Sequence, residues 1–342
     1  MKKYLLPKNG NFYKANLHCH TNISDGKLSP EEIKNLYKEN GYSIVAYTDH
    51  EVYITHNDLT DSDFLALNGM EIAFCEMYAN KTYAFAEQCH LLAIALDKSI
   101  EVQPVFAEER HVRYNKHLFS LVNTGGNVRP LDKWYAPSCI NFTIKTCNQK
   151  GFFTVYNHPS WSLENYSQYI NYEGMHAMEM FNGGATALGY EDYNPRVYDD
   201  LLRSGKKLYA IGADDNHNKY AGNPKSPYSD AFKAFTMIKA DNLDYESVSK
   251  ALINGNFYAS ESPEIQELYY EDGKVYIKCS SAQKIYVSYG GRKAQVEYMT
   301  DKPLTSAEFE ISKEHGYFRL TVVGLDGKRA TTNAYYPSEL DK

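Results

Sequence analysis

The sequence predicts an α/β fold built on parallel strands, followed by a small antiparallel β-sandwich. Short apolar strands alternate with amphipathic helices over the first part of the chain, which is typical of parallel α/β folds. Polar residues, many of them histidines or acids, follow these strands. From about residue 260 the pattern changes to short alternating segments separated by Gly, Asp and Asn turns. The length of 342 residues accommodates one large domain and a smaller module.

The first strand is expected over residues 15–20. Side chains two residues apart in a strand project from the same face, so His18 and His20 converge while Cys19 points away. Asp25 follows in a Ser-Asp-Gly turn that allows its carboxylate to fold back towards the histidines. An isolated pair of this kind is more often an ordinary polar strand end than a ligand pair, so the interpretation depends on the rest of the chain.

A helix is expected next. Ser29 is its N-cap, Pro30 its first residue and Glu32 its third residue, which is the spacing of a capping box. A short apolar strand over residues 43–47 follows and leads into Thr-Asp-His, which ends at His50. Strand, helix and strand with polar residues at both strand ends is the arrangement in which parallel α/β folds collect their catalytic groups.

The same alternation continues towards residue 220. Further strands are expected over 64–71, 90–96, 152–156, 178–181 and 208–212, and helices over 108–121, 138–149 and 195–203. At or near the ends of these strands lie Glu71, His90, His158, Asp215 and His217. Asp215 rather than Asp214 is the expected ligand, because two-residue spacing puts it on the same side as His217. His90 has an alternative interpretation as a histidine packed at the start of an apolar strand.

In the last part of the chain, apolar residues recur at every second position rather than in short continuous runs. Val275, Ile277 and Cys279 are apolar at every second position, as expected of antiparallel strands with one buried face. We therefore expect a larger domain over residues 1–260 and a β-sandwich over residues 261–342. No cluster of potential ligands lies in this second part.

Composition excludes several classes of function. The formal net charge is −7 and no run of Lys or Arg occurs, which argues against a nucleic-acid polymer as partner. No apolar stretch approaches the ~18 residues of a membrane span, and the N-terminal apolar run is too short for a signal peptide. The 6 cysteines form no CxxC pair, so reduced thiols and a cytoplasmic location are expected. The oligomeric state is not indicated.

The candidate ligands form one set of imidazoles and carboxylates. They are His18, His20, Asp25, His50, Glu71, His90, His158, Asp215 and His217. Such ligands without thiolates suit zinc, manganese or iron, and the set is too large for one ion, so two or three divalent metal ions are expected as cofactors. Three divalent ions would outweigh the carboxylates and attract a phosphate dianion, and they would generate a hydroxide nucleophile at neutral pH. Of this set, the expected catalytic residues are His18, His20, Asp25, Glu71 and Asp215.

The order of the motifs resembles that of the PHP (polymerase and histidinol phosphatase) family of metal-dependent phosphoesterases. The matching motifs, within residues 12–220, are HxHxxxSDG, TDH, Gly-x-Glu, His-Leu-Leu, Asn-His-Pro and Asp-x-His. This resemblance implies a distorted (β/α)7 TIM-like barrel with a trinuclear centre at the C-terminal ends of its strands, followed here by an appended β-domain. By position, it implies three ligand sets: His18, His20, Glu71 and Asp215; Glu71, His90 and His158; and Asp25, His50 and His217.

Substrate contacts have weaker signals. Arg110, Arg113, Arg129 and Arg196 are the arginines nearest the motif-bearing loops, and of these Arg129 and Arg196 are the expected phosphate contacts; the alternative for each is a solvated surface arginine. Trp161 is expected to wall the site or stack on a base, or else to lie in the core.

The sequence therefore predicts a phosphoesterase for a small phosphomonoester, such as a nucleotide or bisphosphate. Two alternatives remain open: a metallohydrolase of a carboxylic ester, amide or carbamate, and a non-catalytic, metal-containing ligand-binding protein.

Overall fold

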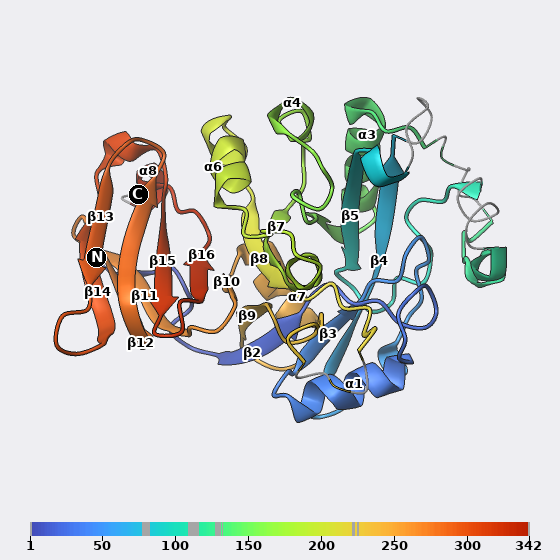
Figure 1. Cartoon of the computed structure of the whole chain (residues 1–342), viewed down its shortest axis with the longest axis horizontal. Helices are drawn as coiled ribbons and strands as arrows, with labels where there is room; N and C mark the ends of the chain where they lie inside the picture. Colours follow the sequence, from blue (N-terminus) through green and yellow to red (C-terminus); the bar gives the residue numbers. More distant parts are fainter. Residues whose placement is uncertain are drawn as a thin grey trace.

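The structure, a computed structural model, describes residues 2–76, 83–108, 116–126, 131, 133–220, 223 and 226–340. The larger part of the fold contains strands β2 (Asn11–Asn16), β3 (Ile44–Tyr47), β4 (Leu65–Cys75), β5 (Gln88–Ala95), β6 (Phe152–Tyr156), β7 (Ala177–Asn182), β8 (Tyr209–Ala213) and β9 (Phe235–Ala240). Its helices are α1 (Pro30–Glu39), α3 (Pro137–Gln149), α4 (Tyr166–Tyr169), α5 (Gly183–Ala187), α6 (Pro195–Arg203) and α7 (Tyr245–Asn254). The fold is therefore mixed α/β with a large sheet (Figure 1).

The strands of the large sheet are not all parallel. β2, β3 and β4 pair in parallel, as do β6, β7 and β8, whereas β5 pairs antiparallel with both β4 and β6. The reversed strand explains why His90 lies near the beginning of its strand. The start of an antiparallel strand lies at the same edge as the ends of its neighbours, so His90 reaches the edge where β4 and β6 carry their polar residues.

The hydrogen-bonded path of the sheet is open between β8 and β9 among the described residues. Side chains join the two strands here. Thr236 Oγ1 accepts a hydrogen bond from Gly212 N–H at 3.1 Å and donates one to Gly212 C=O at 2.8 Å. Gly212 permits this approach, since a Cβ there would lie 2.7 Å from the carbonyl oxygen of Phe235. The sheet is thus not closed by a backbone ladder of the kind that the expected barrel would have.

Most of the expected local elements are present. Helix α1 has the predicted capping box between Ser29 and Glu32, and α3 and α6 match the expected helices closely. The first strand was placed wrongly: β2 ends at Asn16, and the segment that carries the two histidines follows it. Strand β4 runs beyond its expected end, so Glu71 lies inside it. Of the helix expected over 108–121, the structure has a 3₁₀ turn at Lys116–Leu121, and residues 109–115 lie outside the described residues.

The C-terminal strands are antiparallel, as expected. They are β10 (Phe257–Ser260), β11 (Ile265–Glu271), β12 (Lys274–Tyr289), β13 (Ala294–Tyr298), β14 (Leu304–Glu310), β15 (Phe318–Gly324) and β16 (Arg329–Thr332), followed by helix α8 (Pro337–Leu340). The long strand β12 pairs with β11 and β14 through its first half and with β13 and β15 through its second half. Val275, Ile277 and Cys279 are buried, which confirms the predicted alternation.

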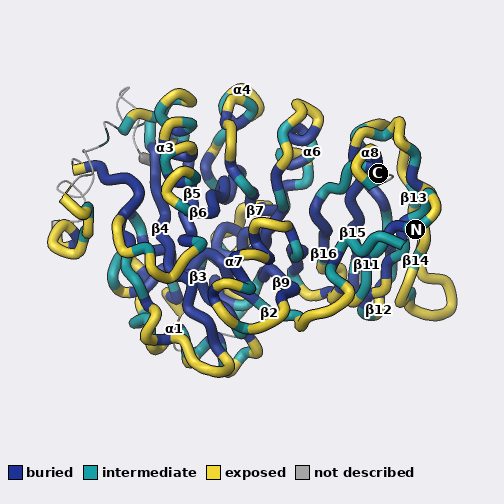
Figure 2. Tube along the Cα trace, turned by 180° about the vertical axis from the view of Figure 1, so that it is seen from behind, coloured by how far each residue is buried: buried dark blue, intermediate teal, exposed yellow. Residues whose placement is uncertain are grey.

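The N-terminal strand β1 (Lys3–Tyr4) pairs antiparallel with β11, so both termini lie beside the C-terminal strands (Figure 1). The division of the chain at residues 260 and 261 stays a prediction. Figure 2 shows that strands β3 to β9 are almost entirely buried, whereas β13 and β14 are mostly exposed, as are many of the connecting loops. No helix in the described part of the chain is long and apolar enough to cross a bilayer.

Candidate metal centre

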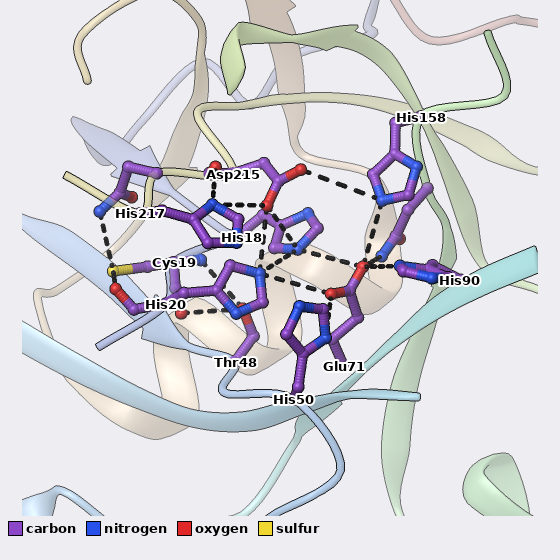
Figure 3. A network of polar contacts seen from close by, with 12 residues as sticks. His18, Cys19, His20, Thr48, His50, Glu71, His90, His158, Asp215 and His217 are labelled. Carbon is purple, nitrogen blue, oxygen red and sulfur yellow. Dashed lines mark hydrogen bonds and ion pairs between the residues drawn. The ribbon is translucent and has the colours of Figure 1, made fainter. Parts of the chain in front are cut away.

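His18 and His20 lie in the segment that directly follows β2. The residue between them, Cys19, is fully buried and is fixed by its N–H, which donates to Thr48 Oγ1 at 2.9 Å, and by its Sγ, which accepts from Asn216 Nδ2 at 3.4 Å. The His18 and His20 rings therefore project to the opposite side, where their Nε2 atoms lie 3.1 Å apart (Figure 3). This confirms that Cys19 points away from the histidines. Two N–H groups facing each other at this distance would repel, whereas two lone pairs can share a cation.

Glu71 lies at the centre of the site. Its Oε1 atom is 3.3 Å from His18 Nε2, 3.0 Å from His90 Nδ1 and 3.2 Å from His158 Nε2. The same oxygen accepts a hydrogen bond from Asn157 Nδ2 at 2.8 Å. His90 on β5 and His158, just after β6, thus both approach this oxygen of Glu71 on β4 (Figure 3).

The second oxygen of Glu71 has a different set of neighbours. Oε2 lies 3.4 Å from His20 Nε2 and 2.9 Å from His50 Nδ1. Neither the contact with His20 nor that with His50 has hydrogen-bond geometry, and Glu71 Oε2, His50 Nδ1 and His20 Nδ1 are all buried without a hydrogen-bond partner in the described structure. Buried polar atoms without partners are costly, and a cation coordinated by them would remove that cost.

Asp215 completes the site from β8. Its Oδ1 atom lies 3.2 Å from His18 Nε2 and 3.1 Å from His20 Nε2. Its φ of 50° is a left-handed conformation, which is uncommon outside glycine. The neighbouring Asp214 points elsewhere: its carboxylate accepts hydrogen bonds from Tyr37 Oη and from three successive backbone N–H groups starting at Phe232. The structure therefore brings Asp215, and not Asp214, to the histidines.

Asp25, His50 and His217 form the most accessible part of the site. Asp25 Oδ2 lies 3.4 Å from His217 Nε2 and 3.8 Å from His50 Nε2, and Asp25 Oδ1 lies 3.8 Å from His20 Nδ1. The Asp25 side chain is 55% exposed, whereas that of Glu71 is 1% exposed. An ion held here would exchange with solvent more readily than one held beside Glu71.

Within the described part of the chain, three groups have ligand atoms close enough to hold a cation, with all atoms of a group within 4.8 Å of one another. They are His18, His20 and Asp215; His50, Glu71 and His90; and His20, Asp25, His50 and His217. The groups share His20 and His50, so they form one continuous cluster. His158 belongs to none of the three, although it contacts Glu71. Nitrogen and oxygen donors without thiolates, together with the unpartnered buried atoms, fit divalent cations.

The site is strongly polarised. Burial alone would lower the pKa of both His20 and His158. The carboxylates of Asp215 and Glu71 outweigh this effect and raise the pKa to about 10 for His20 and to about 9 for His158. Burial would raise the pKa of Glu71, yet the surrounding imidazoles hold it well below its usual range. For His90, burial prevails and lowers the pKa to about 4. The carboxylates are thus held ionised and are available to a cation.

One carboxylate of the site was missed by the sequence argument. Glu179, on β7, is fully buried; its Oε1 lies 2.7 Å from His18 Nδ1, and its Oε2 accepts hydrogen bonds from His158 N–H and Asn182 Nδ2, each at 2.8 Å. It therefore orients His18 through the ring nitrogen that faces away from Asp215. The signal was an acid inside an otherwise apolar strand, Met178-Glu179-Met180.

The predicted substrate contacts have different positions. A cavity of about 610 Å³ opens over the cluster, and Trp161 lines it. Arg196 does not line this cavity: its side chain on α6 is 82% exposed and pairs with Asp200 at 2.9 Å. Arg129, like Arg110 and Arg113, lies outside the described residues.

No protein-family model matches the chain, and no curated protein matches it. Among solved structures, it is similar to a two-domain protein from Bacteroides vulgatus that contains a predicted PHP-like metal-dependent phosphoesterase; the identity is 16%, the TM-score 0.46, and the match covers 97% of this chain and 98% of that chain. It is also similar to a proposed metal-dependent phosphoesterase from Bifidobacterium adolescentis, with 16% identity, a TM-score of 0.40, and coverage of 73% and 98%. A third similar structure is a lesion-specific endonuclease from Pyrococcus furiosus, with 12% identity, a TM-score of 0.40, and coverage of 71% and 56%. Two of these neighbours are described as predicted or proposed metal-dependent phosphoesterases.

Proposed function

We propose that the chain is a metal-dependent phosphoesterase that hydrolyses a small phosphomonoester in the cavity above Glu71. The observation that carries the proposal is the position of Glu71, whose two oxygens contact imidazole nitrogens of five histidines. A buried carboxylate shared in this way is suited to bridge neighbouring cations. A site for a single structural ion would need about four ligands rather than a continuous cluster.

Two or three divalent ions, of zinc, manganese or iron, would be held by the cluster. The ligand sets implied by the motif resemblance divide the cluster differently from the groups found by distance, which share His20 and His50 and leave out His158. When bound, such ions supply a hydroxide nucleophile at neutral pH and stabilise charge on a phosphoryl group. The trinuclear arrangement, a distorted (β/α)7 barrel around it and a separate β-sandwich over residues 261–342 are parts of the same proposal.

The charge of the site favours binding of a phosphate dianion only when the cluster holds three divalent ions. Glu179 adds a fourth carboxylate to Asp25, Glu71 and Asp215. Two divalent ions would only neutralise four carboxylates, whereas a third would leave a net positive charge. We therefore propose that the accessible position at Asp25, His50 and His217 determines whether substrate binds.

The chain's own residues would orient the reaction. The partly exposed Asp25 lines the cavity, and Asn182 steadies Asp215 through a hydrogen bond of 3.2 Å that it donates to Oδ2. In the hydrolysis, water adds its hydroxide to phosphorus, the ester P–O bond breaks and the alcohol oxygen takes the remaining proton. The small cavity supports a small phosphorylated substrate rather than a nucleic-acid polymer.

The test is phosphate release from a panel of phosphomonoesters, bisphosphates and diesters, with manganese or zinc added. Asp215→Ala should abolish release, and His315→Ala, in the 3₁₀ turn between β14 and β15, should leave it unchanged. Release that survives Asp215→Ala would refute the assignment of the site. Hydrolysis of carboxylic esters or amides without any phosphate release would favour the carbonyl alternative, and a flat result for every substrate would favour a ligand-binding protein.

A further inference from the structure

The lining of the cavity combines two kinds of chemistry. It includes the imidazoles and carboxylates around Glu71, and it also includes four large apolar or aromatic side chains, Trp161, Leu188, Tyr220 and Tyr228. Three of these side chains are unusually exposed for large apolar groups: Leu188 by 63%, Tyr220 by 53% and Tyr228 by 68%. Exposed apolar groups gathered at the mouth of one cavity are typical of a ligand-binding surface.

Trp161 is held directly beside the metal cluster. Its ring centroid lies 4.9 Å from that of His158 and 5.1 Å from that of His90, and both ring pairs are strongly inclined. The turn that carries it is fixed because Ser162 N–H donates to His158 C=O at 3.1 Å and Ser162 Oγ lies 3.2 Å from His158 Nδ1. The indole therefore stands at a set distance from any phosphate bound at the cluster.

Tyr220 and Tyr228 are placed by the loop between β8 and β9. Their ring centroids lie 6.2 Å apart with an angle of 39° between the planes. The near-buried Asp230 joins the two ends of this loop, because its carboxylate accepts hydrogen bonds from His217 N–H at 2.8 Å and from Asn218 N–H at 3.1 Å. The two tyrosines are thus tied to the segment that carries the candidate ligand His217.

The volume and the lining of the cavity together favour a substrate that is larger than phosphate and has an apolar part. About 610 Å³ is within the range of sites for small organic molecules and exceeds what a phosphate alone requires. A planar ring between the indole and the tyrosines would bury apolar surface that a sugar phosphate alone would leave exposed. Building on the proposed function, we propose that the substrate is a phosphomonoester whose alcohol part carries a planar aromatic ring, bound by Trp161, Tyr220 and Tyr228.

The test compares two substrates with the same leaving group. Adenosine 5′-monophosphate and ribose 5-phosphate both release a primary 5′-alcohol, and they differ by the aromatic base. Stacking on an aromatic side chain contributes about 1–3 kcal/mol per base, so kcat/KM should be roughly tenfold or more higher for the nucleotide. The double variant Tyr220→Ala with Tyr228→Ala should lower kcat/KM for the nucleotide more than for ribose 5-phosphate and so remove most of this preference.

Two controls separate ring binding from other effects. Tyr220→Phe with Tyr228→Phe keeps the rings and should keep the preference, and Tyr298→Ala, an exposed tyrosine on β13, should change nothing. Equal kcat/KM for both substrates in the unmodified protein would overturn this inference while the proposed function stands. An equal loss for both substrates in the double alanine variant would also overturn it. No release from either substrate, with release from other phosphomonoesters of the panel, would overturn this inference alone, and no release from any phosphomonoester, with metal supplied, would refute the proposed function and the inference with it.

Discussion

Glu179 Oε1 lies 2.7 Å from His18 Nδ1, and both side chains are fully buried. A carboxylate at this position fixes the ring orientation of the histidine and makes its other nitrogen a better ligand. Because Glu179 also holds the backbone N–H of His158, it acts on two of the candidate ligands at once.

We predict that Glu179→Gln weakens metal binding about 10–100-fold, as is usual when the partner of a ligating histidine is lost. The measurement is the dissociation constant for manganese or zinc, determined with the metal-free protein. Glu173→Gln, at an exposed glutamate, is the matched control and should bind metal normally. Unchanged affinity in Glu179→Gln would show that His18 does not need this partner.

Metal binding should release protons, and affinity should increase with pH. The pKa of His158 is about 9 and that of His20 about 10, so without a bound cation both rings are protonated at neutral pH and must lose a proton to act as ligands. Calorimetry in buffers of different ionisation enthalpy gives the number of protons released. Affinity that is independent of pH between about 7 and 10 would contradict the assignment of these two ligands.

The same two shifts predict how the metal-free protein responds to alkali. A histidine whose pKa is raised by folding stabilises the folded state fully below its unfolded value of about 6.5, where it is protonated in both states. This contribution is lost as pH rises through about 9 for His158 and about 10 for His20. The free energy of unfolding of the metal-free protein should therefore decrease between pH 7 and 10, and metal should suppress the decrease. Denaturant titrations at several pH values provide the measurement.

Asp214 is predicted to stabilise the fold rather than bind metal. Its buried carboxylate accepts hydrogen bonds from Tyr37 Oη and from three backbone N–H groups, so Asp214→Ala leaves several buried donors unsatisfied. We expect a loss of about 3–5 kcal/mol in the free energy of unfolding. Asp241→Ala, at an exposed aspartate, should change it by less than about 0.5 kcal/mol. Equal stability of the two variants would refute this role.

A smaller loss in the free energy of unfolding is expected at the junction between β8 and β9. Thr236→Val preserves the shape of the side chain but removes both hydrogen bonds to Gly212, so we expect a loss of about 1–2 kcal/mol. Thr300→Val, at an exposed position, is the control. Urea titration of both variants measures the difference. No loss in Thr236→Val would mean that packing alone holds the two strands together.

Much of the candidate cluster was predictable because its signal is local. His18 and His20, like Asp215 and His217, are two residues apart, and this spacing predicted that each pair lies on one side, although β2 ends at Asn16, before the two histidines. The capping box at Ser29 and Glu32 is equally local, and the structure has it as predicted.

Other features depend on contacts between distant parts of the chain. Nothing within residues 88–95 indicates that β5 runs against its neighbours, because strand direction is set by the connections and not by local pattern. Glu179 contacts His18, which lies 161 residues away in the sequence, and a single acid in an apolar strand does not indicate which residue it will contact. Tyr220 and Tyr228 were missed for the same reason, since they join the predicted Trp161 only around the folded cavity.

The most direct test of the account is the number of divalent ions that the protein binds. Metal-free protein titrated with zinc or manganese, with bound metal counted by elemental analysis, should take up two or three ions per chain. Glu71→Gln should lose at least one of them, because both of its oxygens face candidate ligands. Binding of no metal by the unmodified chain, or full binding by Glu71→Gln, would contradict the central claim that these residues form one multinuclear centre.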